Sequence, residues 1–335
     1  YCSSGYPSIL PTSDNEAYFV GNLDFLGQIH PVNAFQSTSG GENDVFVMKV
    51  AASPHIEFCS YLGGTYSDGI WNAFLDASNN VIIAGGTRSP DFPTKNAYDS
   101  TFGGDLDGFL VKVTSDGRLA WSTFLGGADE EGCRLLGLAA DDSGDMYVEI
   151  LNDSAPFGDV ARISDEGQLL WSLYLNGRLK SSFVDWYDNL ILAGDTEATD
   201  LPATDGFQTG NAGKYDAFVM KIQGDGPLAW CTYVGGSQKD LVGQWRGSWK
   251  SDSSDYKDEG RCILSDSGCL YMIGETNSPD FPTTGGFDTS YGGGKSDAFV
   301  MKLHVSPPPP SVATTSLPDG VALTPYSYAL SVDGG

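Results

Sequence analysis

One strand sequence occurs four times in this chain, and this repetition restricts the possible folds more than any other feature. Each copy reads Asp-x-Phe, two apolar residues and Lys, and the copies begin at Asp44, Asp107, Asp216 and Asp297. The phrase Ser-Pro-Asp-Phe-Pro-Thr occurs at 89–94 and again at 278–283. A third phrase, an aromatic residue followed by a short strand and Gly-Gly, ends at Gly64, Gly127 and Gly236. Repetition at such a period indicates stacked supersecondary units.

Each unit reads as four short strands, which we term A to D. Strands A and B flank a turn rich in Asp, Ser and Gly, as at 141–144, and these residues favour hairpins because they tolerate a left-handed backbone. A Gly- and Pro-rich loop leads to strand C, the Asp-x-Phe phrase, and a second turn leads to strand D. In strand C, Phe109, Val111 and Val113 alternate with their neighbours, which is the pattern of a half-buried strand. Long amphipathic helical windows are absent.

Five such units can be counted, and they span residues 6–64, 65–127, 128–177, 178–236 and 237–304. Unit three is short because its B–C loop is reduced to 152–156, and unit five is long because 242–259 is inserted before strand A. Four strands per unit predict an all-β chain, a β-propeller of five four-stranded blades in one closed ring. A linear solenoid is the alternative architecture.

With these phrases, the units resemble the SBBP repeats, a family of bacterial β-propeller repeats that combine Tyr-Leu-Gly-Gly, Asp-Phe-Pro-Thr and Asp-Ala-Phe-Val-x-Lys segments. Units two and five match nearly throughout and units one and four in part. Unit three lacks the Asp-Phe-Pro-Thr segment and the Asp-x-Phe anchor. The resemblance covers most of 6–304 and implies a propeller of the kind found mainly in exported proteins. It implies location better than activity.

After residue 304 the composition changes, which divides the chain into a propeller (1–304), a Pro-rich linker (305–316) and a β-strand tail (317–335). Four consecutive prolines at 307–310 predict a stiff, extended segment. The tail is similar to the opening of bacterial immunoglobulin-like modules, and it is long enough for one or two strands of such a module.

Unit five has strands A, B and C but runs from Leu303 directly into the linker, so its strand D is missing. A bare sheet edge leaves unpaired N–H and C=O groups and invites another strand. The N-terminus, at 1–3, could close the ring as a clasp. The alternative donor is the tail, whose strand residues are Tyr326, Tyr328, Leu330 and Val332. Tail donation could occur within the chain or between chains, and between chains it would build a filament.

The composition is strongly acidic: 18 Lys and Arg against 44 Asp and Glu give a net charge of −26. This sign repels phosphate backbones and anionic membranes, which argues against a nucleic-acid partner. No run approaches the ~20 apolar residues of a membrane span, which argues against membrane insertion. The chain starts at Tyr1 without a basic and apolar leader, so we expect a mature or internal piece of an exported protein.

Six cysteines occur without a Cys-x-x-Cys pair, and only three histidines are present, which argues against a zinc site. An even cysteine count in a Gly- and Pro-rich chain fits an exported protein with disulfides. Cys262 and Cys269 flank the turn at 265–268, so we expect a local bridge between them. The other pairings stay open.

The repeated polar and aromatic residues have structural as well as functional interpretations. The Asp that opens strand C could line a ring of carboxylates for cations, but capping of the preceding Gly-Gly turn fits better. For Phe92 and Phe281, packing in the gap between neighbouring blades is a better interpretation than an exposed binding rim. Three tryptophans share one position of the repeat: Trp121, Trp171 and Trp230. This recurrence indicates core packing rather than a platform for sugars.

The inserted loop of unit five has no counterpart in the other units, and unrepeated loops on a rigid scaffold are common sites of function. Its aromatic residues, which could stack on a glycan or bury against a partner, are Trp245, Trp249 and Tyr256. Its acidic residues, which could bind calcium although their spacing is not that of an EF-hand, are Asp252, Asp255, Asp258 and Glu259. A solvated loop with neither role is the alternative.

No nucleophile elbow occurs, and the three histidines lie outside any nucleophile context. The sequence therefore favours an exported structural or adhesive module of a cell surface or extracellular assembly, with copies of itself or other surface proteins as partners. The alternative is a glycan-binding or glycan-cleaving propeller that uses acidic residues. Unrepeated polar residues at the mouth of a central channel would favour the alternative. A distinctive surface on the blade edges and the tail would favour assembly.

Overall fold

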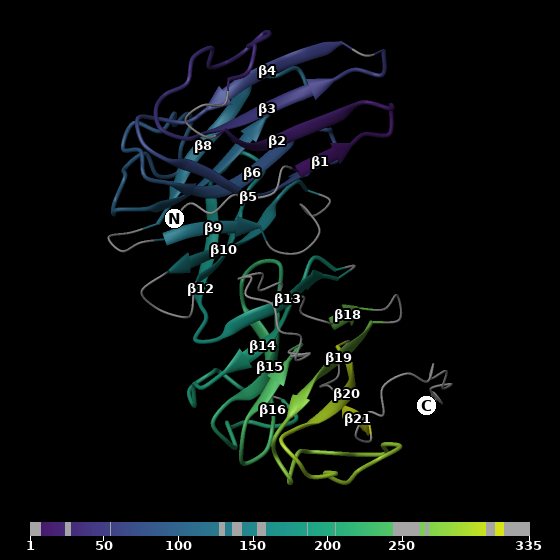
Figure 1. The fold of residues 1–335 in the computed structure, drawn as a ribbon. Helices are drawn as coiled ribbons and strands as arrows, with labels where there is room; N and C mark the ends of the chain where they lie inside the picture. Colours follow the sequence, from purple (N-terminus) through teal and green to yellow (C-terminus); the bar gives the residue numbers. More distant parts are fainter. Residues whose placement is uncertain are drawn as a thin grey trace.

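The computed structural model is built from β-strands and turns, and the part of the chain that it describes contains no helix, and so none that could span a membrane. The described residues are 8–23, 28–53, 55–126, 131–135, 143–152, 159–185, 187–204, 206–243, 262–264, 268–305 and 312–317. The strands form five antiparallel sheets, each a blade of a β-propeller (Figure 1). The predicted all-β propeller fold and the number of blades are thereby confirmed.

Each blade follows the chain from strand A at one edge of the sheet to strand D at the other. Blade 1 comprises β1 (Ser8–Pro11), β2 (Ala17–Leu23), β3 (Asp44–Val50) and β4 (Ile56–Leu62). Blade 2 comprises β5 (Asp68–Leu75), β6 (Val81–Thr87), β7 (Asp107–Val113) and β8 (Leu119–Leu125). Blade 3 comprises β9 (Glu131–Leu135), β10 (Met146–Asn152), β11 (Asp159–Ile163) and β12 (Leu169–Tyr174).

The last two blades follow the same order. Blade 4 comprises β13 (Arg178–Val184), β14 (Leu190–Thr196), β15 (Asp216–Ile222) and β16 (Leu228–Val234). Blade 5 comprises β17 (Asp240–Val242), β18 (Cys262–Leu264), β19 (Cys269–Thr276), β20 (Asp297–His304) and β21 (Val312–Leu317).

The A–B hairpins form because their turns contain residues that accept a left-handed backbone. Asn15, Asn79 and Asp188 occupy the same turn position in blades 1, 2 and 4, with φ of 60°, 59° and 58°. Gly144 and Gly268 take this position in blades 3 and 5. Asn, Asp and Gly are the residues that adopt this conformation at least cost, so the predicted hairpins are confirmed together with their mechanism.

The insertion in unit five interrupts strand A instead of preceding it. β17 and β18 both pair with β19: the last residue of β17 lies opposite Gly274, and the first residue of β18 lies opposite Met272. Between them, the chain leaves the ladder after Gly243 and returns at Cys262. Strand A of blade 2 has a register shift at the same position, between Ile70 and Asn72. The insertion therefore extends an existing β-bulge, a place where extra residues cause least disruption to the ladder.

Four apolar cores hold the five blades together, one between each pair of consecutive blades. Strands β7 and β15, in blades 2 and 4, are buried along their whole length. A closed ring of five blades has five interfaces, but no core, hydrogen bond or ion pair joins the described residues of blades 1 and 5. These blades lie at opposite ends of the molecule (Figure 1). The predicted ring closure is therefore wrong for the described chain, and the array is open.

The missing strand D of blade 5 is β21, which belongs to the same chain. It pairs antiparallel with β20, from Leu303 opposite Val312 to Ala298 opposite Leu317. This strand lies mainly in the segment that the composition assigned to the linker. The two donors predicted from the sequence, 1–3 at the N-terminus and 326–332 in the tail, lie outside the described residues.

The outer edges of three blades are covered by their own B–C loops. Val32 pairs with Cys59 in blade 1 and Lys95 with Ser122 in blade 2. In blade 4 the N–H of Tyr233 donates to the carbonyl of Gln208 at 2.9 Å. Occupied edge groups hinder edge-to-edge pairing with another chain. Of these three blades, blade 1 alone keeps a sheet face that no described neighbouring blade covers.

Removal of residues 306–335 tests the assignment of β21. The deletion uncovers one edge of β20, and each backbone hydrogen bond lost contributes about 0.5–1.5 kcal/mol net to stability. We expect amide exchange in Asp297–His304 to accelerate and the melting temperature to fall, while exchange in Asp44–Val50 serves as the internal control. Unchanged exchange in Asp297–His304 would show that β21 does not complete blade 5.

Candidate functional site

The densest network of polar contacts lies where one blade ends in Gly-Gly and the next begins. Asp68 opens strand A of blade 2 and is 1% exposed. Its carboxylate accepts the N–H of Gly64 at 2.7 Å, the hydroxyl of Ser89 at 3.0 Å and the hydroxyl of Thr87. Three donors satisfy a carboxylate that would otherwise be costly to bury. The Gly-Gly turn is thereby fixed to the following blade.

The same network recurs between blades 4 and 5. Asp240 accepts the N–H of Gly236 at 2.8 Å, the hydroxyl of Ser278 at 2.8 Å and that of Thr276 at 2.5 Å. The two Ser-Pro-Asp-Phe-Pro-Thr phrases, read from the sequence as one repeated motif, therefore serve one structural purpose. We call this arrangement, with its packing, the interblade joint.

The Asp within each phrase fixes the residue after Gly-Gly. Asp91 accepts the N–H of Thr65 at 2.8 Å and its hydroxyl at 2.5 Å. Asp280 accepts the N–H of Ser237 at 2.8 Å and its hydroxyl at 2.9 Å. Both carboxylates are solvated, and hydrogen bonds from the residues they clamp hold their pKa below the usual range.

Burial has the opposite effect on the carboxylates inside the joint. It raises the pKa of Asp68 to about 7, against the opposing effect of the three hydrogen bonds. Burial also raises the pKa of Asp216 to about 6, with a smaller contribution from the nearby charge of Asp240. One oxygen of Asp216 is buried without a hydrogen-bond partner among the described residues. These acids therefore take up protons near neutral pH because water cannot reach them.

The Asp that opens each of the four Asp-x-Phe copies of strand C caps the loop before it, as the sequence predicted. In these four copies a backbone N–H in the preceding loop donates to the carboxylate. The pairs are Gly40 to Asp44 at 2.8 Å, Gly103 to Asp107 at 2.7 Å, Ala212 to Asp216 at 2.8 Å and Gly292 to Asp297 at 2.5 Å. No group of three or more His, Cys, Asp or Glu among the described residues is arranged to hold a metal ion.

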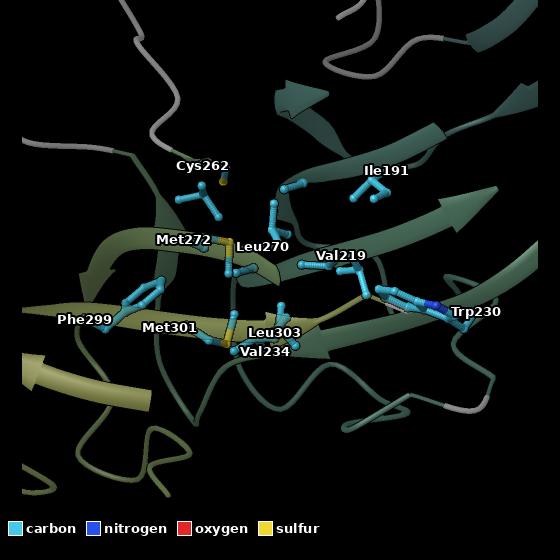
Figure 2. Packing of buried hydrophobic residues seen from close by; sticks show 14 of the residues in the cluster. Ile191, Val219, Trp230, Val234, Cys262, Leu270, Met272, Phe299, Met301 and Leu303 are labelled. Atoms are coloured by element: carbon cyan, nitrogen blue, oxygen red, sulfur yellow. The ribbon is translucent and has the colours of Figure 1, made fainter. Parts of the chain in front are cut away.

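The repeated aromatic residues fill the interfaces, again as predicted. Phe92 is 3% exposed and stacks on Phe109 at 4.6 Å, and Phe281 stacks on Phe299 at 4.7 Å. Figure 2 shows Phe299 and Trp230 at two sides of the core between blades 4 and 5. The indole N–H of Trp121 donates to the carbonyl of Asp165 in the next blade at 2.7 Å. These rings are therefore packing elements and no platform for sugars.

A cation from strand C crosses each of the four interfaces to the C–D turn of the next blade. The acceptors are backbone carbonyls or, once, a carboxylate. The pairs are Lys49 with Ser115 at 3.4 Å, Lys112 with Asp165, Arg162 with Gly224, and Lys221 with Val305 at 3.1 Å. Each cation also pairs with an acid of its own blade, such as Lys112 with Asp76 at 2.9 Å.

Sequence analysis did not single out these cations. The signal was present, since the Asp-x-Phe phrase ends in Lys in all four copies. It was overlooked because a Lys at a strand end is usually solvated. The residues of the predicted glycan and calcium sites and of the assembly strand lie outside the described residues: Trp245, Trp249, Tyr256, Asp252, Asp255, Asp258, Glu259, Tyr326, Tyr328, Leu330 and Val332.

The predicted bridge between Cys262 and Cys269 is not formed. Both thiols are free and buried, as are those of Cys59 and Cys231. Cys262 stands opposite Met272 in the ladder and Cys269 opposite His304, so the two cysteines do not face each other. Burial raises the pKa of Cys262 to about 11, which disfavours the reactive thiolate.

An open groove of about 610 Å³ lies on the outer edge of blades 1 and 2. Its lining combines an aromatic ring, two cations and a carboxylate, from Phe35, Lys95, Arg118 and Asp91. The nitrogen of Lys95 is already bonded to the carbonyl of Leu119 at 2.6 Å. By position, the groove belongs to the blade edges and lies away from the strand A edges.

Comparison with known proteins found solved structures that match this chain at low identity and low TM-score. No protein-family model matches the chain and no curated protein is similar to it, so the resemblance to SBBP repeats stays a prediction. The structure of the Dos1 propeller has 11% identity and a TM-score of 0.41, with 91% of this chain and 83% of that chain covered. An exo-β-1,3-galactanase from Clostridium thermocellum has 10% identity and a TM-score of 0.33, with coverage of 92% and 60%.

A polysaccharide lyase of the PL25 ulvan lyase type has 8% identity and a TM-score of 0.38, with 92% of this chain and 69% of that chain covered. The chain thus spans 60% of the galactanase structure and larger parts of the other two. At these identities and TM-scores the similarity carries no information on chemistry, and the fold is defined by the strands described above.

The pKa of Asp68 predicts an unusual dependence of stability on pH. Because the pKa is higher in the folded state (about 7) than in the unfolded chain (3.8), Asp68 favours folding when protonated and opposes it increasingly as pH rises from about 4 to 7. The stability advantage of the wild type over Asp68→Asn should shrink across this range in urea titrations. Asp91→Asn is the control, since the lowered pKa of Asp91 predicts an advantage that grows as pH rises through 3.8. Parallel curves for both variants would contradict the assignment.

Proposed function

We propose that this chain is an exported structural or adhesive module of a cell surface or extracellular assembly. One observation carries the proposal: the residues that recur along the chain are used inside the joints between blades. Asp68 and Asp240 fix the blade-to-blade turns, and Phe92 and Phe281 fill the interfaces. The repeated chemistry therefore builds a stiff array and leaves no repeated ligand site among the described residues.

Two further features support an assembling role. The net charge of −26 disfavours nucleic acid and anionic membranes and keeps an exposed array soluble. The outer edges of blades 1, 2 and 4 are covered by their own loops, as is usual where a sheet must avoid uncontrolled edge pairing. The partners that fit are copies of this chain or other surface proteins.

A glycan-directed function is the second candidate, favoured by one observation. The insertion of blade 5 leaves and re-enters strand A at Gly243 and Cys262, at the sheet edge opposite the covered outer edges. A loop placed there, with its two Trp, one Tyr and four acidic residues, could bind a glycan or calcium. The groove beside Arg118 is a separate candidate surface for a glycan.

Cell fractionation with imaging tests the first proposal. We expect the native protein in the extracellular or surface fraction, as polymers or as surface-bound particles in electron micrographs. Recovery in the cytoplasm as single particles would refute the proposal.

The glycan alternative has its own readout. Binding to a polysaccharide panel, or release of reducing ends, would support it if Arg118→Ala or deletion of 244–261 abolishes the signal. Tyr187→Ala, at a side chain that is 80% exposed in blade 4, should leave the signal unchanged. Absence of binding and cleavage in the wild-type chain would exclude the alternative for that panel.

A further inference from the structure

We propose that the open face of blade 5 docks onto the open face of blade 1 in a second copy of this chain, so that copies associate head to tail. The inference rests on the structural role proposed above, and it names the partner and the contact surface. It follows from the repeat, because the two open faces match the two halves of the blade-to-blade interface that is formed four times inside the chain.

Blade 1 presents one half of this joint uncovered. Its free face carries Phe19, Phe46 and Met48, which are all half-buried. The register places Ile83, Phe109 and Val111 of blade 2 at the same three positions. In blade 2 these residues are 0% exposed, since blade 1 covers them. A blade placed on the free face of blade 1 would bury the same three positions.

Blade 5 presents the other half. Tyr271 and Val300 are half-buried, and Ile273 is 40% exposed. The equivalent residues of blade 2 are Ile82, Leu110 and Ala84, all 0% exposed because they pack against blade 3. Each end of the array is thus an apolar sheet face whose internal counterparts are fully covered. Burying such faces is the main driving force of association.

The polar half of the joint is also complete at blade 5. Lys302 has the strand position of Lys49, Lys112, Arg162 and Lys221, which all cross to the next blade. Among the described residues, its only polar contact is the ring of Tyr271 at 5.6 Å. The same Tyr and cation pair is found as Tyr18 with Lys49 and as Tyr147 with Arg162. Lys302 therefore has the position of a fifth crossing cation, and no following blade is present among the described residues to accept from it.

Blade 1 has the matching acceptors. The hydroxyls of Tyr18 and Tyr147 donate at 2.8 Å to the carbonyls of Asn79 and Asp188 in the next blade. The equivalent turn residue of blade 1 is Asn15, which has the same φ of 60° and is exposed. That carbonyl is the predicted acceptor for Tyr271.

The acceptor for Lys302 follows from the same comparison. Ser115, which accepts from Lys49, is two residues beyond the end of strand C in blade 2. The residue two beyond the end of strand C in blade 1 is Ala52, which is exposed. The backbone carbonyl of Ala52 is therefore the predicted acceptor for Lys302.

The occupant is a second copy because its end blade carries the matching half of the interface, while the described residues of one chain do not bring the two end faces together. Blades 1 and 5 lie at opposite ends of the molecule (Figure 1) and share no core between described residues. The contact joins two different surfaces, so it is heterologous and continues into an open chain of copies when it does not close on itself.

A mixing experiment with two blocked variants tests this contact. Met48→Glu places a charge on the face of blade 1, and Ile273→Glu places one on the face of blade 5. Both positions are partly exposed in the single chain, and circular dichroism and melting verify folding. Tyr187→Glu, at a side chain that is 80% exposed in blade 4, is the matched control. The readout is analytical ultracentrifugation under reducing conditions.

We expect the wild type and Tyr187→Glu to form a concentration-dependent series of oligomers. Each blocked variant alone should be monomeric, and an equimolar mixture should form dimers and nothing larger, because only one intact pair of faces remains. Lys302→Gln introduced into the Met48→Glu partner should raise the Kd of this dimer about 10-fold or more, since hydrogen bonds to charged groups are worth about 1.5–3 kcal/mol.

Two outcomes would overturn the proposal. A mixture that stays monomeric while the wild type is also monomeric would mean that the ends close within one chain or stay open. Wild-type oligomers that survive both Glu substitutions would place assembly on another surface. That second result would leave the proposed structural role intact, whereas cytoplasmic single particles would refute the role itself.

Discussion

The structure depends on one interaction, the cation that each blade extends across the interface to the next. Lys112 is buried in blade 2 between Asp76 of its own blade and Asp165 of blade 3. Burying a charge is costly unless it is paired and hydrogen-bonded. One of the two carboxylate partners of Lys112 comes from the following blade. A blade that lacks its following neighbour therefore retains a cation without this partner as well as an uncovered apolar face. Stability is therefore shared between neighbours, as expected for a repeat protein.

The same interface explains why the turns are as invariant as the strands. Gly117 and Gly167, in the C–D turns of blades 2 and 3, have φ of 82° and 80° and lie against Phe58 and Trp121 of the preceding blade. A Cβ at either glycine would lie 2.6 Å from the ring. Glycine is therefore required at this turn position for two reasons: the backbone has a positive φ, and the ring of the preceding blade leaves no room for a Cβ. The glycines of the repeat are thus interface residues, and their recurrence says nothing about a ligand.

Much of the fold was predictable because periodic patterns report local structure. The four Asp-x-Phe phrases located strand C, and the Asp- and Gly-rich turns located the hairpins. Ring closure and the origin of the last strand were not predictable, since both depend on how far blades rotate against each other and on where a short strand finds a free edge. Cys262 and Cys269 flank one turn, but ladder register decides which side chains meet, and the pairing of Leu264 with Leu270 sets Cys262 opposite Met272.

The polarity of the joint constrains any assembly built from this chain. In every internal interface the cation comes from the lower-numbered blade and its acceptor from the higher-numbered one. In two of these interfaces a Tyr hydroxyl is donated in the same direction. Two copies of blade 1 therefore cannot satisfy each other, because both offer acceptors such as Asn15, and two copies of blade 5 would bring Lys302 against Lys302. A symmetric dimer through either end is disfavoured by unpaired donors and like charges. An array with such ends therefore has a single polarity, in which blade 1 of each copy covers blade 5 of the copy before it.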